Sequence, residues 1–394
     1  MVVPRTPVSE LKTPAVIVYL DVLEANIAEM TRLASEAGVR LRPHTKIHEC
    51  PEIAKMQVAA GACGIEVGTV ERATCMAAAG IDDILIAHPF SDAHRLRELK
   101  RLLGQPGLRV TVMVDMIEQA QEISWLGEAS GTPIPTLLKL NTGGNRFGVQ
   151  PGEPAVALAR QLYELPGMTL AGLYAHESGV QPTRDSQEQV AFAVAKDVAE
   201  TARLLVRSGI QAPHVSVGAS PTLRATCALL RTGAFPEITE IHPGHCVLPD
   251  MWHVRSAVSR REECAAAILC AVMSVTSPAY AVIDAGYKTF GADPLIQYRD
   301  MAGAFWEGMP TYGSVQGRPD LWVGRLSAEA ACVHYMDPNG PSPRLGLGDR
   351  LEIVPNNATL AISLQSEIYG VRNGVVERVF AVGGRPSRTA AGRR

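Results

Sequence analysis

The sequence predicts an α/β protein, namely a (β/α)8 barrel of the TIM type with a C-terminal β domain. From about residue 40 to residue 245, short β-rich runs alternate with segments of helical spacing, and eight such repeats are present. This alternation is typical of a parallel sheet, and eight repeats favour a closed barrel over an open sheet. Beyond residue 255 the helical spacing largely ends, which indicates a separate β domain.

Eight runs are candidate barrel strands: Arg40–His44, Cys63–Gly68, Asp83–His88, Arg109–Asp115, Pro135–Asn141, Leu170–His176, His214–Ala219 and Glu237–Gly244. Helical spacing lies between them, for example at Thr69–Ala79, Pro154–Leu162 and Gln187–Ser208. Later β-rich runs are Ala266–Val275, Tyr280–Ile283, Asp349–Val354 and Tyr369–Val371. We expect a barrel at 26–255, a β domain at 256–382 and a disordered tail at 383–394. We also expect residues 1–25, with the apolar run Ala15–Asp21, to pair with the β domain.

Composition narrows the class of protein. With 394 residues, 46% of them apolar, the chain is long enough for a sizeable core, and a net charge of −3 recommends neither nucleic acid nor an anionic membrane as a partner. The N-terminus lacks the apolar core of a signal peptide, and no run reaches the roughly 18 apolar residues of a membrane span. The eight cysteines form no C-x-x-C pair. We therefore expect a cytoplasmic protein with reduced thiols.

The basic segment Arg42-Pro43-His44-Thr45-Lys46-Ile47-His48 follows the first candidate strand. A lysine becomes an imine-forming nucleophile when desolvation or neighbouring cations lower its pKa. We expect Arg42, His44 and His48 to supply such cations for Lys46. The alternative is a solvated basic loop. Position favours a function, because active sites of such barrels lie at the carboxyl ends of the strands.

Polar or small residues follow other candidate strands. Glu66 lies near the end of the second and His88 ends the third, although both could simply satisfy backbone groups. Further strand ends carry Asn141-Thr142-Gly143-Gly144-Asn145-Arg146, Tyr174-Ala175-His176-Glu177-Ser178-Gly179, Gly218-Ala219-Ser220-Pro221-Thr222 and His242-Pro243-Gly244-His245-Cys246. The loops after strands seven and eight are the usual phosphate site of this fold. An imine-forming lysine and an anion site in one barrel mouth suit pyridoxal phosphate.

Five motifs follow one another along the chain in a fixed order. They are RPHTKIH after the first strand, GGNRFGV after the fifth, GLYAHESG at the sixth, IHPGHCVLPD at the eighth and VIDAGYKTFGADP in the β domain. In this order they resemble the D-threonine aldolase and D-serine dehydratase family. That family belongs to the alanine racemase-like, fold type III pyridoxal phosphate enzymes. The resemblance extends from about residue 12 to residue 382, and RPHTKIH and the Asn-Arg-Phe-Gly loop are its most specific parts.

The resemblance implies a role for each matching residue. Lys46 would form the Schiff base with the cofactor and then act as the proton-transferring base, with His44 and His176 as further catalytic candidates. Arg146 would face the phenolic oxygen of the cofactor, and Tyr174 would lie near its pyridine ring. The residues expected around the phosphate are Gly218, Ser220, Thr222, Gly244 and His245. His176 has a simpler explanation as a hydrogen-bonded residue at a strand end.

One departure from the family concerns a metal. Members usually hold a divalent ion through a His-x-Cys or His-x-Asp pair, and Asn357 and Thr359 occupy those positions here. A neutral amide and a hydroxyl bind zinc or manganese weakly, so we expect the usual metal site to be absent. His334 with Asp337 is a conceivable different site, although a surface turn explains this pair better.

Three functions remain open. The first is a lyase that cleaves or dehydrates D-configured β-hydroxy amino acids, with a side chain such as His334 or His245, or a water held by Asn357, in place of the metal. The second is a metal-independent amino acid racemase or epimerase, which needs only Lys46 and a second base. The third is a pyridoxal phosphate-binding protein without turnover. The resemblance also implies a homodimer and a small amino acid substrate.

Overall fold

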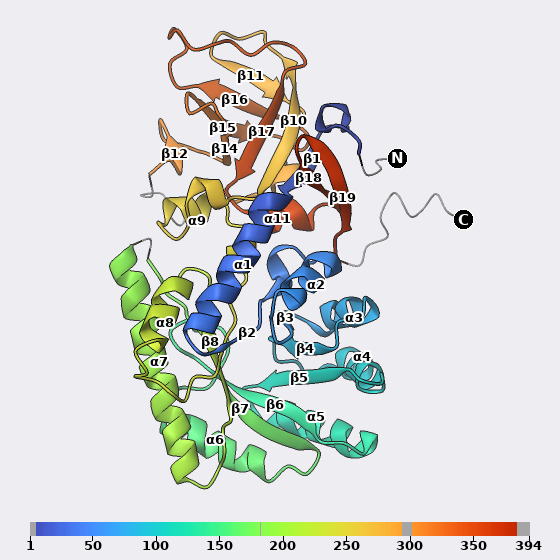
Figure 1. The fold of residues 1–394 in the computed structure, drawn as a ribbon, viewed down its shortest axis with the longest axis vertical. Coiled ribbons are helices and arrows are strands. Elements are labelled where there is room, and N and C mark those ends of the chain that lie inside the picture. The colour runs from blue at the N-terminus through green and yellow to red at the C-terminus, as the bar shows by residue number, and fades with distance from the viewer. Residues whose placement is uncertain (1–4, 182, 294–301, 384–394) are drawn as a thin grey trace, which may run out of the picture. The chain divides into compact units, whose positions relative to one another are not determined.

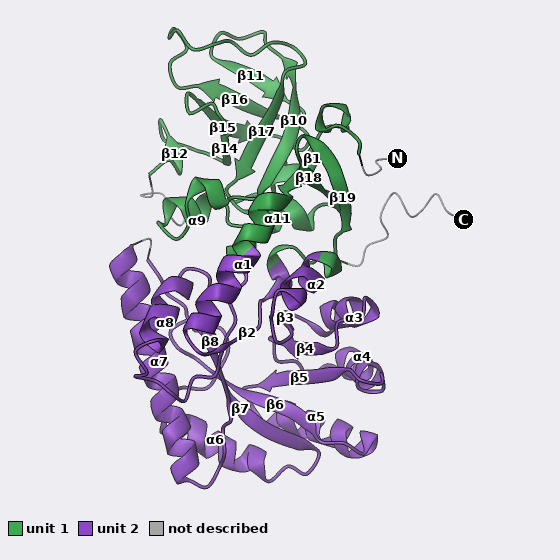
Figure 2. Ribbon diagram, viewed as in Figure 1, with its two compact units in different colours: residues 1–26, 47–52, 246–394 green, residues 27–46, 53–245 purple. Residues whose placement is uncertain are grey.

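The computed structural model describes residues 5–181, 183–293 and 302–383 (Figure 1). The chain divides into two compact units (Figure 2). One comprises residues 27–46 and 53–245, and the other comprises residues 1–26, 47–52 and 246–394. The expected disordered tail lies outside the described residues apart from Gly383. Among the described helices, none is both long and apolar enough to cross a membrane.

The unit at 27–245 contains an eight-stranded parallel sheet, in the order β2-β9-β8-β7-β6-β5-β4-β3. Its strands are β2 (Arg40–Leu41), β3 (Ile65–Val67), β4 (Asp83–Ile86), β5 (Arg109–Val114), β6 (Ile134–Leu140), β7 (Met168–His176), β8 (His214–Gly218) and β9 (Glu240–Ile241). Each lies within or beside a predicted run. The predicted fold class, a TIM-type barrel with a C-terminal β domain, is therefore confirmed.

The barrel closes between β2 and β3, where pairing is sparse. Residues His44 and Glu66 form an isolated parallel bridge, and the N–H of Cys63 donates to Leu41 O at 2.9 Å. The strand β2 is shorter than predicted because Pro43 has no N–H to continue the ladder, and Pro243 limits β9 in the same way. The strands β2 and β9 are thus the shortest in the sheet, at two residues each.

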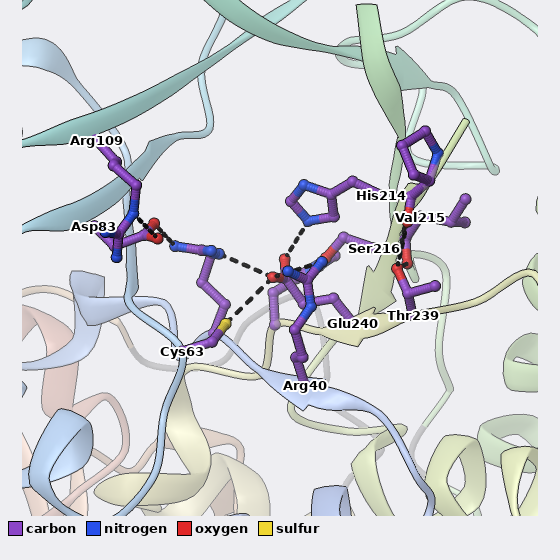
Figure 3. Close-up of polar contacts among 12 residues, drawn as sticks. Arg40, Cys63, Asp83, Arg109, His214, Val215, Ser216, Thr239 and Glu240 are labelled. Carbon is purple, nitrogen blue, oxygen red and sulfur yellow. Dashed lines mark hydrogen bonds and ion pairs between the residues drawn. The ribbon is translucent and has the colours of Figure 1, made fainter. Parts of the chain in front are cut away.

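A buried ion-pair network joins strands on both sides of this closure (Figure 3). Glu240 begins β9, and its side chain is fully buried. Its Oε1 lies 2.8 Å from Nε2 of His214, and its Oε2 accepts from Nε of Arg42 at 3.0 Å. Arg42 also donates to Asp83, which in turn pairs with Arg109 (Figure 3). Side chains therefore link strands whose backbones share few hydrogen bonds.

Helices alternate with the strands of the barrel as predicted, and the first of them follows β1 (Ala15–Tyr19) and precedes β2. They are α1 (Leu20–Glu36), α2 (Pro51–Ala59), α3 (Val70–Ala78), α4 (Ala93–Leu103), α5 (Ile117–Ser130), α6 (Glu153–Tyr163), α7 (Arg184–Arg207) and α8 (Leu223–Leu230). In α3, Val70, Ala73 and Met76 are buried, which is one face at helical spacing. The side chain of Thr183 caps α7 by accepting from the N–H of Ser186.

The other unit is built on a nine-stranded sheet in the order β11-β16-β15-β14-β17-β10-β1-β18-β19. Its strands are β1 (Ala15–Tyr19), β10 (Ala266–Ser274), β11 (Tyr280–Ile283), β14 (Gly313–Val315), β15 (Leu321–Leu326), β16 (Ala331–Tyr335), β17 (Arg350–Pro355), β18 (Glu367–Arg372) and β19 (Val375–Ala381). Two-residue strands β12 (Phe305–Trp306) and β13 (Met309–Pro310) pair separately. Short helices α9 (Met251–Arg255), α10 (Tyr287–Phe290) and α11 (Ala358–Ser363) also occur.

The N-terminal strand β1 lies inside this sheet. It is antiparallel to β10, with Ile17 opposite Ala267, and parallel to β18, with Ile17 opposite Tyr369. The side chain of Ile17 is fully buried, in a cluster that also contains Leu11 and Val371. Residues from the two ends of the sequence therefore share one hydrophobic core.

Candidate active site

Lys46 lies in a single turn of 3-10 helix, Thr45–Ile47, at the carboxyl end of β2. Hydrogen bonds fix the backbone of this turn. The hydroxyl of Thr45 donates to Glu66 O at 3.1 Å, and the N–H of Lys46 donates to Nδ1 of His44 at 3.3 Å. The turn is therefore anchored to β3, while the Lys46 side chain keeps exposed surface.

Although part of the Lys46 residue is exposed, its pKa is lowered, chiefly because neighbouring protein displaces some of the water that would solvate the ammonium. The positive charge of Arg146 lowers the pKa further, whereas the charge of Glu66 opposes the shift. A lowered pKa leaves a larger fraction of the amine neutral, and only the neutral amine is a nucleophile. The structure thus gives Lys46 the property that the sequence predicts.

The cause differs from the predicted one, because the cations of the same segment do not produce the shift. Arg42 is held in ion pairs with Glu240 and Asp83. Burial, followed by the charge of Lys46, holds the pKa of His44 well below its ordinary value, so this imidazole is neutral. In His48, Nδ1 accepts from the N–H of Cys50 at 2.9 Å. The pKa of Lys46 is therefore lowered by desolvation and by the charge of Arg146, and not by Arg42, His44 or His48 as expected.

Glu66 and Tyr174 form a hydrogen-bonded pair across the barrel interior. The phenol of Tyr174, on β7, donates to Oε1 of Glu66 at 2.8 Å, and both side chains are buried. Burial raises the pKa of Glu66 to about 7, although the Tyr174 hydrogen bond and nearby lysines pull it down. The ring of Tyr174 stacks on His242 with centroids 4.1 Å apart. Of the two roles left open for Glu66 by the sequence, its side chain does not bond a backbone group and instead faces this interior.

Lys139 is a site residue that sequence analysis missed. It lies on β6 with its side chain buried, and Nζ donates to Ala87 O at 2.7 Å. The ammonium lies 4.8 Å from the ring centroid of Tyr174 and 5.3 Å from that of Phe147, which are cation–π distances. Burial lowers its pKa to about 8. A lysine within the apolar run Leu137–Leu140 of a barrel strand was the available signal.

Arg146 projects from a loop that is tied down at several points. The side chain of Asn141 accepts from the N–H groups of Gly143 and Asn145, and the N–H of Gly148 donates to Asp115 at 2.7 Å. This loop lines a cavity of about 460 Å³. The guanidinium of Arg146 is exposed there, and its charge lowers the pKa of Lys46.

The residues expected around a phosphate are partly brought together. The hydroxyl of Ser220 accepts from the N–H groups of Gly244 at 3.1 Å and His245 at 2.7 Å, so the loops after β8 and β9 are joined. A Cβ at position 244 would lie 2.8 Å from His44 O, so only glycine permits this close approach. Gly218, with φ of 143°, also adopts a backbone conformation that favours glycine.

Thr222 has a different partner from the one expected. Its hydroxyl donates to the buried carboxyl of Glu177 at the end of β7, and the hydroxyl of Thr226 donates to the same group at 2.9 Å. Burial raises the pKa of Glu177 to about 7, against these hydrogen bonds. Glu177, which sequence analysis did not single out, therefore anchors the loop 219–222 and the start of α8 from behind.

His176 and His88 lie in the same barrel, each neutral at pH 7. Burial and then the charge of Lys46 lower the pKa of His176 to about 3, and burial lowers that of His88 to about 4. The ring of His176 stacks on His242 with centroids 6.2 Å apart, and that of His88 stacks on Phe147 at 5.5 Å. Both residues thus offer neutral imidazoles.

Two buried polar atoms in this interior lack partners among the described residues, namely Oε2 of Glu66 and Nε2 of His242. A buried unpaired polar atom is costly, and a bound polar molecule removes that cost. The absence of a side chain at Gly244 lets the loop after β9 pack directly against the backbone of His44. These residues fit pyridoxal phosphate: Lys46 would hold its aldehyde carbon, Arg146 its phenolic oxygen, and the Ser220 and Gly244 loops its phosphate.

Asn357 and Thr359, which the sequence analysis expects at the family's metal-ligand positions, carry a neutral amide and a neutral hydroxyl. Asn357 caps α11 by accepting from the N–H of Leu360 at 3.1 Å, and its amide donates to Asp293 at 2.8 Å. Across the described ranges, no group of three or more His, Cys, Asp and Glu side chains is arranged to hold a metal ion. His334 is on β16, its ring stacked on Trp322 with centroids 4.3 Å apart.

Comparisons with known proteins agree with this geometry. The family model of the alanine racemase N-terminal domain matches residues 18–248, and a serine dehydratase domain model matches residues 265–371. D-threonine aldolase of Arthrobacter sp. is 30% identical over 97% of this chain and 95% of its own length. D-threo-3-hydroxyaspartate dehydratase of Delftia sp. (strain HT23) is 31% identical over 88% of this chain and 91% of its own length.

A solved structure is similar throughout. D-threonine aldolase from Filomicrobium marinum has a TM-score of 0.84 and 30% identity, and the match covers 97% of this chain and 98% of that one. The parallel barrel, the lysine after its first strand and the appended β domain define an alanine racemase-like protein. Within that class, the chain belongs to the family of D-threonine aldolase and D-threo-3-hydroxyaspartate dehydratase. The family predicted from the sequence is thereby confirmed.

Proposed function

We propose that this protein is a pyridoxal phosphate-dependent lyase that cleaves or dehydrates D-configured β-hydroxy amino acids. The observation that carries the proposal is Lys46, an amine of lowered pKa at the carboxyl end of β2, in one barrel with Arg146 and the Ser220–Gly244 contact. The named relatives act on D-threonine and on 3-hydroxyaspartate, which are β-hydroxy amino acids. Their names support the same substrate class here.

Bound pyridoxal phosphate supplies an aldehyde for the substrate amine and a ring that accepts electron density from the substrate. The chain's own residues bind and orient the cofactor and move a proton near the substrate. Arg146 offers a planar fork of donors to an anionic oxygen, and the Ser220 and Gly244 loops hold the phosphate. Lys46, once free, takes up or returns a proton near the substrate, because its lowered pKa keeps the amine neutral part of the time.

A racemase or epimerase is the second candidate, and the residues at the metal position favour it. Removing and returning an α-proton needs Lys46 and a second base only, whereas Asn357 and Thr359 give a β-hydroxyl no strong cation. The neutral imidazoles of His44 and His176 are candidates for that second base. A binding protein without turnover is the weaker third alternative, because it would not need these groups around Lys46.

Incubation of purified protein with a panel of D- and L-amino acids tests the proposal. Aldehyde, keto acid and α-deuterium exchange are scored separately. We expect aldehyde or keto acid from D-β-hydroxy amino acids, and visible absorbance from bound cofactor that borohydride bleaches and Lys46→Ala removes. Exchange without either product would support the racemase. A colourless protein that pyridoxal phosphate cannot reconstitute would exclude all three alternatives.

The homodimer and the cytoplasmic location stay proposals. Sedimentation velocity of the full-length chain measures the first, and a single species of twice the 42.1 kDa chain mass is expected. A monomer with full activity would contradict the dimer.

A further inference from the structure

Glu66 touches the Lys46 segment through its backbone as well as its side chain. Its N–H donates to Pro43 O at 2.9 Å, and its carbonyl accepts from the hydroxyl of Thr45. These two bonds lie on either side of the bridge between residues 44 and 66. A backbone partner alone would not require an acidic side chain, and any β-forming residue could make both bonds.

The carboxyl group of Glu66 is placed to do more. It is fully buried, one oxygen accepts from Tyr174, and the other has no partner among the described residues. Nε2 of His44 lies 3.7 Å from Oε1. Because Nδ1 of His44 accepts the N–H of Lys46, the neutral ring carries its proton on Nε2, which faces this carboxyl. A chain of contacts therefore runs from Tyr174 through Glu66 and His44 to the backbone N–H of Lys46.

The charged and titratable groups around this pair come from several strands. Some of these groups shift the pKa of Glu66 or Lys46, and others have their own pKa shifted by Lys46. They are His44, His88, Lys139, Arg146, Tyr174, His176, Glu240 and His242. Among these, Arg146 lowers the pKa of Lys46 and Glu66 raises it. The imidazoles of His44, His176 and His242 have lowered pKa values and carry no charge at pH 7. Glu66 is thus the acid whose charge opposes Arg146 at the lysine.

We propose that Glu66 is a positioning residue for Lys46: its backbone holds the Lys46 turn, and its carboxylate sets the charge of the Lys46 amine. This inference deepens the proposed function, because it concerns the amine that would hold the cofactor. When Glu66 is ionised, its negative charge stabilises the ammonium form of Lys46. When Glu66 is protonated, this stabilisation is lost. Glu66 and Lys46 therefore titrate as a pair, and the pH at which Lys46 becomes reactive belongs to both.

The test measures the reactivity of Lys46 in the full-length protein without added cofactor. Trace labelling with acetic anhydride across pH, resolved by peptide mass spectrometry, gives the midpoint at which Lys46 loses its proton, with exposed Lys100 on α4 as the reference amine. Glu66→Gln keeps an oxygen for Tyr174 and removes only the charge. We expect its Lys46 midpoint to fall by about one pH unit. Glu66→Asp, which keeps the charge, should stay closer to the wild type.

Glu237→Gln is the control, because it removes a carboxylate of the same unit that pairs with Arg203 and does not contribute to the Lys46 shift. Its Lys46 midpoint should equal that of the wild type. An unchanged midpoint in folded Glu66→Gln overturns the proposal. If that variant does not fold, Tyr174→Phe decides: loss of its hydrogen bond leaves Glu66 less ionised, so the midpoint should fall by a smaller amount, and no fall overturns the proposal. Failure of the wild type to bind pyridoxal phosphate would refute the proposed function and leave the labelling result intact.

Discussion

Arg146 is an exposed cation in a loop whose backbone is held by Asn141 and Asp115. We expect Arg146→Ala to weaken pyridoxal phosphate binding by about 10-fold to 100-fold, the value of a lost charge-assisted hydrogen bond. Arg146→Lys should recover only part of this loss, because an ammonium lacks the planar fork of a guanidinium. Titration of the visible absorbance with cofactor measures both.

Arg160 on α6 provides a control for this experiment. It is exposed and its guanidinium donates to Oγ of Ser208 at 3.2 Å, so Arg160→Ala should bind the cofactor like the wild type. Equal affinity in Arg146→Ala and Arg160→Ala would remove Arg146 from the site.

Asn357 and Thr359 lead to a prediction about metal. The Asn357 amide is engaged with Leu360 and Asp293, and neither residue supplies an imidazole or a charged oxygen. Activity of the wild type should therefore survive EDTA. The double variant Asn357→His, Thr359→Asp should bind zinc or manganese, measured by plasma mass spectrometry, and should gain an EDTA-sensitive component of aldehyde release.

The single variant Thr359→Asp controls for the added charge and should bind metal weakly, since it lacks the imidazole. Wild-type protein purified with stoichiometric zinc or manganese, and inactivated by EDTA, would show that other residues hold the ion. The metal-dependent lyase would then replace the present proposal.

At the level of the elements, the loop between β8 and α8 depends on Glu177. Two threonine hydroxyls donate to this buried carboxyl. In Glu177→Gln, one acceptor oxygen is replaced by an amide NH2 group, which would face the hydroxyl of Thr222 or Thr226 in place of an acceptor, so the loop should shift. We expect about 10-fold weaker binding of pyridoxal phosphate, in line with one unsatisfied buried group. Binding of pyridoxal, which lacks the phosphate, should change less.

The raised pKa of the Glu177 carboxyl also predicts that the stability of the protein depends on pH. Because burial raises the folded-state pKa of Glu177 to about 7 from 4.5, its contribution is full below pH 4.5 and is lost as the pH rises towards 7. In Glu177→Gln, the part of the fall in melting temperature between pH 5 and pH 7.5 that comes from ionisation of Glu177 should be absent. Parallel pH profiles for the two proteins would contradict the assignment.

The elements also show where sequence analysis succeeds and fails. The long strands β5, β6 and β7 were predicted because apolar runs bounded by turn residues identify them. The ends of β2 and β9 were not predicted correctly, because Pro43 and Pro243 interrupt the backbone hydrogen bonding of the sheet inside β-rich runs that look continuous in the sequence. Lys46 and Arg146 could be found from motifs. Glu177 could not, since its role comes from hydroxyls 45 and 49 positions later, which no local pattern reveals.

For the whole molecule, the network around Glu240 should govern acid stability. Burial alone would raise the pKa of Glu240, but His214 and Arg42 hold it well below its ordinary value (Figure 3). Its stabilising contribution is therefore present above pH 4.5 and is lost as the pH falls through the depressed folded-state pKa. Glu240→Gln should cost about 3 kcal/mol in the free energy of unfolding at pH 7.

Urea unfolding at pH 7 and at pH 3.5 measures this effect. The difference between wild type and Glu240→Gln should be smaller at the lower pH. Glu200→Gln, on the exposed face of α7, should change the free energy of unfolding by less than about 0.5 kcal/mol. A difference that grows on acidification would mean that Glu240 is not stabilised as an anion.

The position of β1 also affects the newly made chain. This strand is completed by residue 19, but its neighbours β10 and β18 begin at residues 266 and 367. At roughly 5–20 residues per second of synthesis, β18 emerges roughly 20–70 seconds after β1. Until β10 is made, Ala15–Tyr19 has neither neighbour, and an apolar strand with two open edges is prone to pair with other chains. The apolar segment Ala15–Tyr19 therefore stays open to pairing with other chains until translation has passed residue 266.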